Sequence, residues 1–177
     1  NSDLANNLGN LYSRTVAMCL RYFEGTLAGA GSIAPTEIFA GIDLAAVVRE
    51  IQSRIESCEY NIALATIWQQ VLDPANRYID RTKPFELAKT DRAACNRVLV
   101  NLAEAIRIAA ILTKPFIPAA SAKLYAGFNY ATSYDAVRFE HAATPAAAPA
   151  NLRVTAELKD GKVAPLFPRI ELKEAKA

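Results

Sequence analysis

The stretch DRAACNRVLVNLAEAIRIAAILT, residues 91–113, decides the fold of this chain. Its apolar side chains do not form a single helical stripe but are spread around much of the circumference. They are Val98, Leu99, Leu102, Ile106, Ile108, Ile111 and Leu112. A helix of this composition normally has neighbours on several sides, so the stretch predicts the central helix of a helical domain.

Three amphipathic segments precede this central helix. Residues 3–23, 43–60 and 61–80 each place apolar side chains at the spacing of a helix that is buried on one side. Pro74 lies inside the third segment, where it removes one hydrogen bond and should kink the helix. Residues 81–89 are expected to form a short linker to the central helix. Short connections between four to five helices predict an all-α antiparallel bundle.

The character of the sequence changes after the central helix. Pro115 and Pro118 end that helix and begin another, which reaches Phe128. Residues 142–150, AATPAAAPA, are of low complexity and typical of a linker. Residues 152–172 then alternate apolar and polar side chains around an Asp-Gly pair, which predicts a hairpin-like or extended tail.

The length of 177 residues fits one domain with an appended tail. We expect a helical bundle over residues 1–130, a short helix and an Ala/Pro-rich linker over 131–151, and a tail over 152–177 that packs back on the bundle or on another domain of the same polypeptide. No internal repeat divides the chain further.

Composition excludes most kinds of active site. The formal net charge is only +2, so a site for nucleic acid must be a local patch. Cys19, Cys58 and Cys95 lie too far apart for a CxxC metal pair, and we expect three buried thiols. The single histidine, His141, excludes His-cluster metal sites and most Ser-His catalysis. Without a phosphate-binding motif or a membrane-spanning run, the sequence predicts a cytoplasmic chain with no catalytic residue, metal or cofactor of its own.

A polar stripe lies on the first helical segment, opposite its apolar face. Asn10 and Arg14 are separated by four residues, and Arg21 follows seven later, so the three side chains share one side of the helix. Asn is a mediocre helix former with no capping role at position 10, which hints at function. The alternative is that the stripe is simply a solvated surface.

A second cluster combines cations and aromatic rings. Arg77, Arg81 and Lys83 are interleaved with Tyr78 and Phe85. Such a pattern suits single-stranded RNA, because splayed bases stack on rings while cations meet phosphates. The alternatives are that Tyr78 packs in the core, that the cations only solubilise the protein, and that Phe85 fills the gap between two helices.

Five short runs of this sequence resemble one known family. NLGNLYSR (7–14), NRYID (76–80), KPFELAK (83–89), KPFIP (114–118) and PLFPRI (165–170) are similar, in this order, to motifs of the anticodon-binding domain of methionyl-tRNA synthetases. All but the last are shared loosely with the class I synthetases for Ile, Leu, Val and Cys. The closing PLFPRI run favours the methionine enzyme.

The resemblance implies roles for individual residues. Asn10 and Arg14 would form hydrogen bonds to bases of the CAU anticodon. Phe85 would occupy the place of the family's usual Trp, on which the anticodon cytosine stacks. The phenylalanine side chain is smaller than tryptophan and lacks the indole N–H. The side chains expected at the RNA backbone are Arg21, Arg77, Arg81 and Lys83.

The resemblance also implies partners outside this chain. The RNA would be the initiator and elongator methionine tRNAs. The other partner would be the catalytic domain of the same polypeptide, which uses ATP, carries a zinc-bearing insert and has no counterpart here, so the chain reads as a C-terminal fragment of the ligase. Two alternatives stay open: the corresponding domain of a related class I synthetase, and a helical protein-interaction module.

Overall fold

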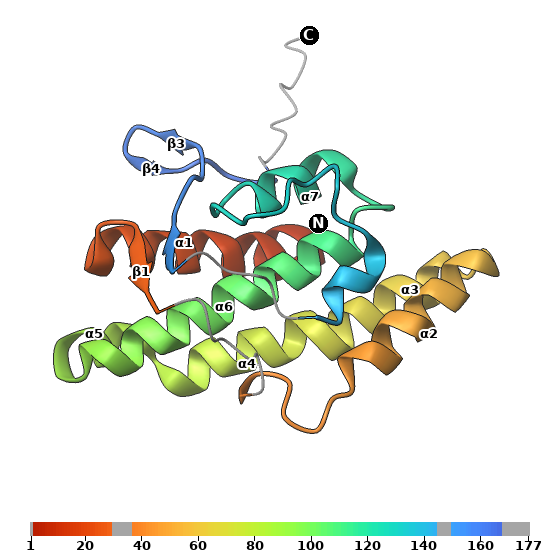
Figure 1. Cartoon of the computed structure of the whole chain (residues 1–177), viewed down its shortest axis with the longest axis horizontal. Helices are drawn as coiled ribbons and strands as arrows, with labels where there is room; N and C mark the ends of the chain where they lie inside the picture. The colour runs from red at the N-terminus through yellow and green to blue at the C-terminus, as the bar shows by residue number, and fades with distance from the viewer. Residues whose placement is uncertain (1, 30–36, 145–149, 168–177) are drawn as a thin grey trace, which may run out of the picture.

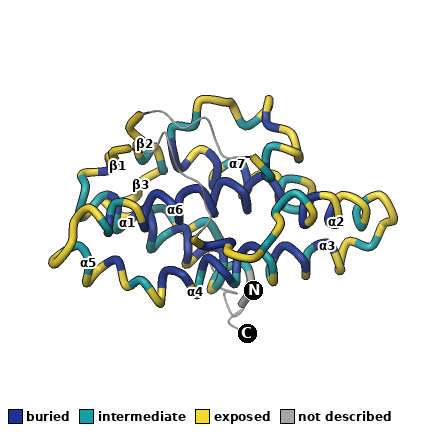
Figure 2. The backbone as a smooth tube through the Cα atoms, turned by 60° about the horizontal axis from the view of Figure 1, so that its bottom comes forward, coloured by how far each residue is buried: buried dark blue, intermediate teal, exposed yellow. Residues whose placement is uncertain are grey.

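The computed structural model describes residues 2–29, 37–144 and 150–167, with side chains from residue 4 onward. Its centre is α6 (Arg92–Leu112), which lies between α1 (Asn10–Phe23) on one side and α4 (Asp73–Thr82) on the other (Figure 1). Every residue of α6 from Val98 to its end is buried. Figure 2 shows the same distribution, with burial greatest along α6 and exposure on the outer turns. The prediction of a central helix in an all-α bundle is confirmed.

The first helical segment begins as a π-helix, η1 (Ser2–Gly9), and continues as α1. It ends where Glu24 adopts a left-handed conformation and Gly25 follows at φ 74°. The buried residues of α1 are Leu11, Tyr12, Thr15, Val16 and Cys19. The π-helix turns less per residue than the α-helix expected from the sequence. The side-chain directions expected for an α-helix, with 100° between successive residues, therefore apply only from Asn10 onward.

A helical hairpin follows, formed by α2 (Leu44–Glu56) and α3 (Tyr60–Ile67). The Asp43 side chain accepts a hydrogen bond from the backbone N–H of Ala46 and caps α2. The predicted helix 43–60 ends four residues early, because Cys58 turns the chain at φ 59°. Cys58 is exposed, so the prediction of three buried thiols is wrong at this position.

Pro74 lies where the helix type changes. The chain runs from α3 through a five-residue π-helix, η4 (Trp68–Leu72), into α4, where Pro74 occupies the first turn. The helical path does not break before Pro74, because Leu72 and Asp73 are both helical and the Asp73 N–H donates to the Trp68 carbonyl oxygen. The wider π turn thus accommodates the ring, and the predicted segment 61–80 becomes three consecutive helical pieces.

The predicted linker over residues 81–89 is wrong for most of its length. Lys83 is left-handed, at φ 44°, and ends α4, after which α5 (Pro84–Thr90) begins with Pro84 in its first turn. Proline is favoured at the start of a helix, and the residues that follow are good helix formers. The short helix α5 packs on α6.

The chain after α7 (Pro118–Tyr125) returns across the bundle through a 3-10 turn, η5 (Phe139–Ala142). Strand β2 (Asn151–Arg153) then pairs antiparallel with β1 (Thr26–Ala28). A hairpin of β3 (Leu158–Lys159) and β4 (Lys162–Val163) turns at Asp160–Gly161, both at positive φ, and projects from the body (Figure 1). The hairpin-like tail is confirmed, whereas the expected domain boundaries stay a prediction, and Pro168, Arg169 and Ile170 of the closing motif lie outside the described residues.

Candidate functional site

A row of polar contacts joins the N-terminal helix to α4. Asn7 Nδ2 donates to Asp73 Oδ1 (3.3 Å), and Asn76 Nδ2 donates to Asn7 Oδ1 (2.6 Å). Further along both helices, Arg14 donates to Asp80. Residue numbers rise in the same direction along the N-terminal helix and along α4, so the two helices run parallel. In the sequence they are separated by the α2–α3 hairpin. This row of contacts leaves no pattern in the sequence, because its partners lie more than sixty residues apart.

Arg14 is held in place by Asp80. Both terminal nitrogens of its guanidinium donate to Asp80 Oδ1, at 3.2 and 3.1 Å. The Arg14 side chain is 37% exposed and that of Asp80 67% exposed. Exposed ion pairs of this kind contribute only about 0–1 kcal/mol to stability, so the contact orients Arg14 more than it supports the fold. A guanidinium carries five N–H donors, and several remain for an external acceptor.

Asn10 and Arg21 lie on the same exposed line of α1 as Arg14. Asn10 is the first residue of α1 and is exposed beside a groove of about 510 Å³. Arg21 is exposed two turns beyond Arg14, with its guanidinium carbon 5.6 Å from the centre of the Tyr22 ring. The polar stripe drawn from the sequence therefore exists, and all three side chains are accessible.

Phe85 does not fill a gap between helices. Its side chain is 46% exposed on the first turn of α5, a helix that contacts α1 as well as α6. The neighbouring Pro84 is buried, and its carbonyl oxygen accepts a hydrogen bond from the Cys95 thiol at 3.2 Å. The buried proline anchors the turn while the phenylalanine ring projects, so the alternative of a core plug is wrong.

The basic-aromatic cluster divides into exposed cations and a buried ring. Arg77, Arg81 and Lys83 are all exposed. Tyr78 is only 2% exposed, and its hydroxyl donates to Glu37 Oε2 (2.7 Å) and accepts from Asn101 Nδ2 (3.0 Å). Burial raises the pKa of Tyr78 to about 12. Tyr78 is thus a core residue, as the simpler alternative held, and Phe85 is the ring of this cluster that remains available for stacking.

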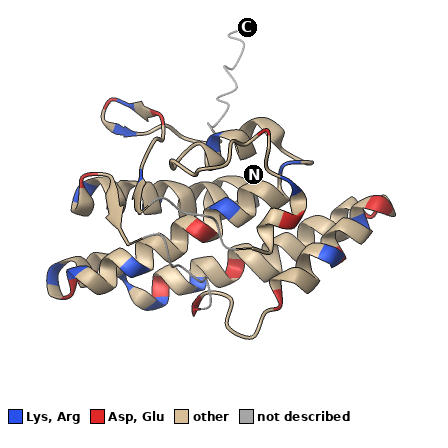
Figure 3. Cartoon of the chain, viewed as in Figure 1, with Lys and Arg blue, Asp and Glu red and all other residues tan. Residues whose placement is uncertain are grey.

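Charges over the surface are mixed. Figure 3 shows that basic and acidic residues are interspersed along α4 and α5. Lys83 donates to Glu86 at 3.4 Å, and the Arg81 guanidinium lies 5.8 Å from the Tyr78 ring centre. No broad positive field covers this face, which agrees with the net charge of +2.

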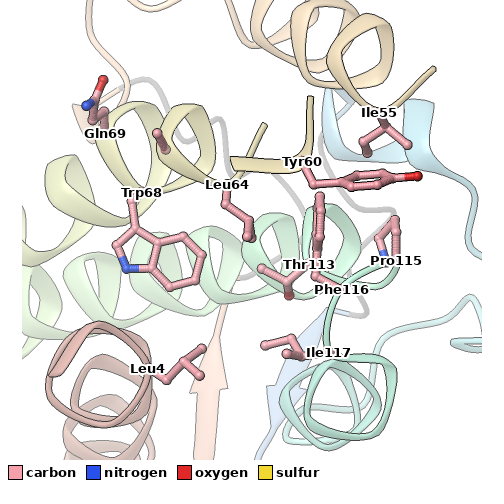
Figure 4. Close-up of a pocket in the computed structure, with 11 residues that line it drawn as sticks. Leu4, Ile55, Tyr60, Leu64, Trp68, Gln69, Thr113, Pro115, Phe116 and Ile117 are labelled. Carbon is pink, nitrogen blue, oxygen red and sulfur yellow. The ribbon is translucent and has the colours of Figure 1, made fainter. Parts of the chain in front are cut away.

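A second concave surface, an apolar groove of about 970 Å³, lies at the other end of η1 (Figure 4). Its lining residues come from η1, α2, α3, η4 and the α6–α7 connection: Leu4, Ile55, Tyr60, Leu64, Ala65, Trp68, Gln69, Thr113, Pro115, Phe116 and Ile117. None of them is charged, so the groove is unsuited to a phosphate backbone.

Within the described ranges, no group of three or more His, Cys, Asp or Glu side chains is arranged to hold a metal ion. No helix in these ranges combines the length and hydropathy that crossing a membrane requires. The exposed Asn10, Arg14 and Phe85 are suited to recognition by hydrogen bonding and stacking.

The comparisons with known proteins all point to the same family. The sequence profile for the anticodon binding domain of methionyl tRNA ligase matches residues 27–158. Methionine–tRNA ligase of Bacillus subtilis (strain 168) is 36% identical over 181 residues, covering 98% of this chain and 25% of the relative. The ligase of Lactococcus lactis subsp. lactis is 40% identical over 129 residues, covering 71% of this chain and 19% of the relative. This chain therefore spans about a quarter or less of the length of these curated relatives.

Solved structures give the same fold. Mycobacterium tuberculosis methionyl-tRNA synthetase in complex with methionyl-adenylate superposes with a TM-score of 0.74 at 25% identity, covering 96% of this chain and 32% of the other. The apo form of that enzyme gives a TM-score of 0.75 at 24% identity, with coverages of 98% and 34%. Because the profile match takes in well over half of the sequence, and the relatives and the fold agree with it, this chain belongs to the family of anticodon-binding domains of methionyl-tRNA ligases.

Proposed function

We propose that this chain recognises the CAU anticodon of methionine tRNAs, both initiator and elongator. The observation that carries the proposal is that Asn10 and Phe85 are exposed and that Arg14 is partly accessible, on α1 and α5, two helices in contact. Hydrogen-bonding side chains on one helix and an accessible ring on a helix that contacts it provide what unpaired bases require, namely edge contacts and a stacking surface.

Each of the three residues contributes a different interaction. The Asn10 amide offers one donor group and one acceptor to a base edge, which distinguishes bases by their hydrogen-bonding pattern. Arg14, oriented by Asp80, directs its remaining N–H groups outward. Phe85 stacks on the cytosine, an interaction worth about 1–3 kcal/mol. The contacts with Asp80 and the buried Pro84 hold two of these groups in position before RNA arrives.

The exposed cations Arg21, Arg77, Arg81 and Lys83 are proposed to contact the RNA backbone. Each phosphate neutralised in single-stranded RNA contributes about −0.7 to the slope of log binding constant against log salt. Four contacts predict a slope of roughly −3, moderate for an RNA-binding protein and consistent with a net charge of only +2.

The whole protein is proposed to be a cytoplasmic methionine–tRNA ligase. Its relatives are about four times as long as this chain, and the catalytic domain of the same polypeptide is the second proposed partner. ATP and zinc would bind in that domain. We propose no catalytic residue, metal or cofactor within this chain.

A protein-interaction module is the second candidate, favoured by one observation, the uncharged apolar groove at Leu4, Trp68 and Phe116. Salt separates the two candidates. Binding through phosphates weakens steeply as salt rises, whereas an apolar interface is much less sensitive.

The direct test is titration of the 177-residue chain with an anticodon stem-loop bearing CAU and with one whose first base is changed. We expect the CAU loop to bind on the order of 5- to 100-fold more tightly, as expected for the loss of one base contact of about 1–3 kcal/mol. The control variant is Arg49→Ala, which removes an exposed arginine from α2, away from α1 and α5. Equal affinity for the two loops would overturn the proposal.

A further inference from the structure

A groove of about 510 Å³ lies where η1 passes into α1, beside Asn10. One wall is formed by the helix and the other by the chain that follows the β3–β4 hairpin. The lining residues are Ala5, Asn6, Gly9, Asn10, Ser13, Pro165, Leu166 and Phe167. Of this set, only Asn10 takes part in the proposed function.

Gly9 explains how the tail reaches the helix. A Cβ at position 9 would lie 3.3 Å from Phe167 Cδ2 and 3.2 Å from the backbone oxygen of Leu4. The missing side chain therefore lets the Phe167 ring lie directly against the helix backbone. On the neighbouring side, Pro165 and Leu166 also border a small cavity with Tyr12 of α1. The tail is thus seated along the helix at the end that carries Asn10.

One wall of the groove is polar and the other is apolar. The helix wall supplies polar groups, the amides of Asn6 and Asn10 and the hydroxyl of Ser13. The tail wall supplies the apolar surfaces of Pro165, Leu166 and Phe167. No cation lines the groove, so a phosphate is not its natural ligand. A planar molecule with apolar faces and hydrogen-bonding edges fits both walls, and a nucleobase has these properties.

The backbone at this place is also unusual. The groove lies at the junction of a π-helix with an α-helix, and π segments within helices occur frequently at functional sites. The volume lies within the range of about 300–1,000 Å³ that is typical of ligand sites. Arg14 follows one turn beyond Asn10, so a base in the groove and another at Arg14 would belong to one short stretch of RNA.

We infer that this groove is a pocket for one unpaired anticodon base, in which Phe167 forms the apolar wall and Asn6 and Ser13 add contacts to the base edge beside Asn10. The inference rests on the proposed function and extends it, because it makes the tail part of the RNA site. A base enters with one face against the Phe167 ring and its edge toward the three polar side chains of the helix.

The test uses Phe167→Ala in the 177-residue chain and four stem-loops, one intact and three with a single abasic anticodon position. We expect Phe167→Ala to weaken binding of the intact loop on the order of 5- to 100-fold, equivalent to about 1–3 kcal/mol for one stack. The loss should vanish with the one loop that lacks the base at Phe167, since that contact no longer exists. Ser13→Ala should weaken binding less and show the same dependence on position.

Two further variants complete the design. Leu158→Ala removes an exposed side chain of the same tail, on β3 and outside the groove, and should leave all four affinities unchanged. Gly9→Ala should weaken binding in the same position-dependent way but less than Phe167→Ala, because the new methyl group, 3.3 Å from Phe167 Cδ2, shifts the ring by only a few tenths of an ångström. If Phe167→Ala lost the same affinity for all four loops, the Phe167 ring would have only a structural role, and the inference would be overturned. Unchanged affinities for Phe167→Ala would also overturn it, and losses for Asn10→Ala and Phe85→Ala would then show that the proposed function still holds.

Discussion

Gly127 lies so close to the Tyr12 ring that a Cβ added to it would be 2.6 Å from Tyr12 Cε2 and 2.7 Å from the hydroxyl oxygen. Tyr12 is buried, and Gly127 follows directly after α7. The backbone N–H of Gly127 donates to Leu124 O, and its carbonyl accepts from Thr155 N. Glycine is required here for space, because it lets the α7 turn and the tail close against α1.

Replacing Gly127 by Ala should therefore destabilise the protein. The nearest atoms belong to a buried aromatic ring, which has little freedom to move, and overpacking of this kind costs about 1–3 kcal/mol. Denaturant melts of wild type and Gly127→Ala measure the difference. Gly41→Ala is a poor control because of its positive φ, whereas Ala126→Ser, at an exposed neighbouring position, should change stability by less than about 0.5 kcal/mol. An unchanged midpoint for Gly127→Ala would contradict the close contact.

A second prediction concerns the buried ion pair of Glu104 and Arg107 on α6. The Arg107 Nη2 and Nε atoms donate to the Glu104 carboxylate at 2.7 and 2.8 Å, and both side chains are nearly inaccessible. Arg107 also donates to the backbone oxygens of His141 (3.1 Å) and Thr144 (2.6 Å). Arg107→Met should cost about 3–5 kcal/mol, because a buried carboxylate loses its cation.

The double variant Glu104→Leu with Arg107→Met distinguishes the charge from the volume. Removing both charges should recover part of the stability, since replacing a buried pair by apolar residues is often nearly neutral. Arg97→Met, at an exposed position of the same helix, should have little effect. A double variant less stable than Arg107→Met alone would mean that the charge of Glu104 is not the cause.

Alkaline pH should destabilise the fold. Burial raises the pKa of Tyr12 from 10.0 to about 12 and that of Cys19 from 9.0 to about 12. Above pH 9 to 10 the unfolded chain therefore loses protons that the folded chain keeps, and the free energy of unfolding falls as pH rises toward 12. Melts at intervals from pH 8 to about 11 measure this slope. Tyr12→Phe should make the slope shallower between pH 10 and 11, and an identical slope would contradict the assignment.

Asn10→Ala and Arg14→Ala should weaken RNA binding while leaving the fold intact. Both positions face outward, and surface changes on a helix usually alter stability by less than about 0.5 kcal/mol. A lost hydrogen bond to a base edge costs about 1–3 kcal/mol of binding when its partner stays unpaired. Stem-loop titrations and thermal melts on the same samples compare the two effects. An unfolded Arg14→Ala variant, or unchanged charging of tRNA by the complete enzyme, would refute the assigned role.

Phe85→Ala should reduce affinity for the CAU stem-loop by about 1–3 kcal/mol with little loss of stability, since the ring is about half exposed. Phe85→Trp should be tolerated, because the projecting ring has room to grow, and the larger surface should bind at least as tightly. Titrations of both variants against wild type decide the point. If Phe85→Ala lowered the free energy of unfolding by about 3–5 kcal/mol, Phe85 would be a core residue and not part of the RNA site.

The local elements could be predicted from the sequence because helical periodicity and end signals are properties of neighbouring residues. The apolar side chains spread around the helix over 91–113 identified α6 as central, and the structure adds a cap in which the Asp91 side chain accepts from the Ala94 backbone N–H. The exposed line of Asn10, Arg14 and Arg21 also follows from spacing alone, since α1 is regular from Asn10 onward.

Contacts between distant parts of the chain were decided only by the tertiary structure. Asp80 meets Arg14 across 66 positions, and Phe167 covers Gly9 from the far end of the chain. Neither pairing leaves a periodic signal in the sequence. The two aromatic residues Tyr78 and Phe85 show the same limit. Tyr78 is buried and its hydroxyl is hydrogen-bonded to Glu37 and Asn101, whereas Phe85 projects from a helix that begins at Pro84. Sequence spacing fixes which side of a helix a residue occupies, but which neighbour covers that side depends on how all the helices pack together.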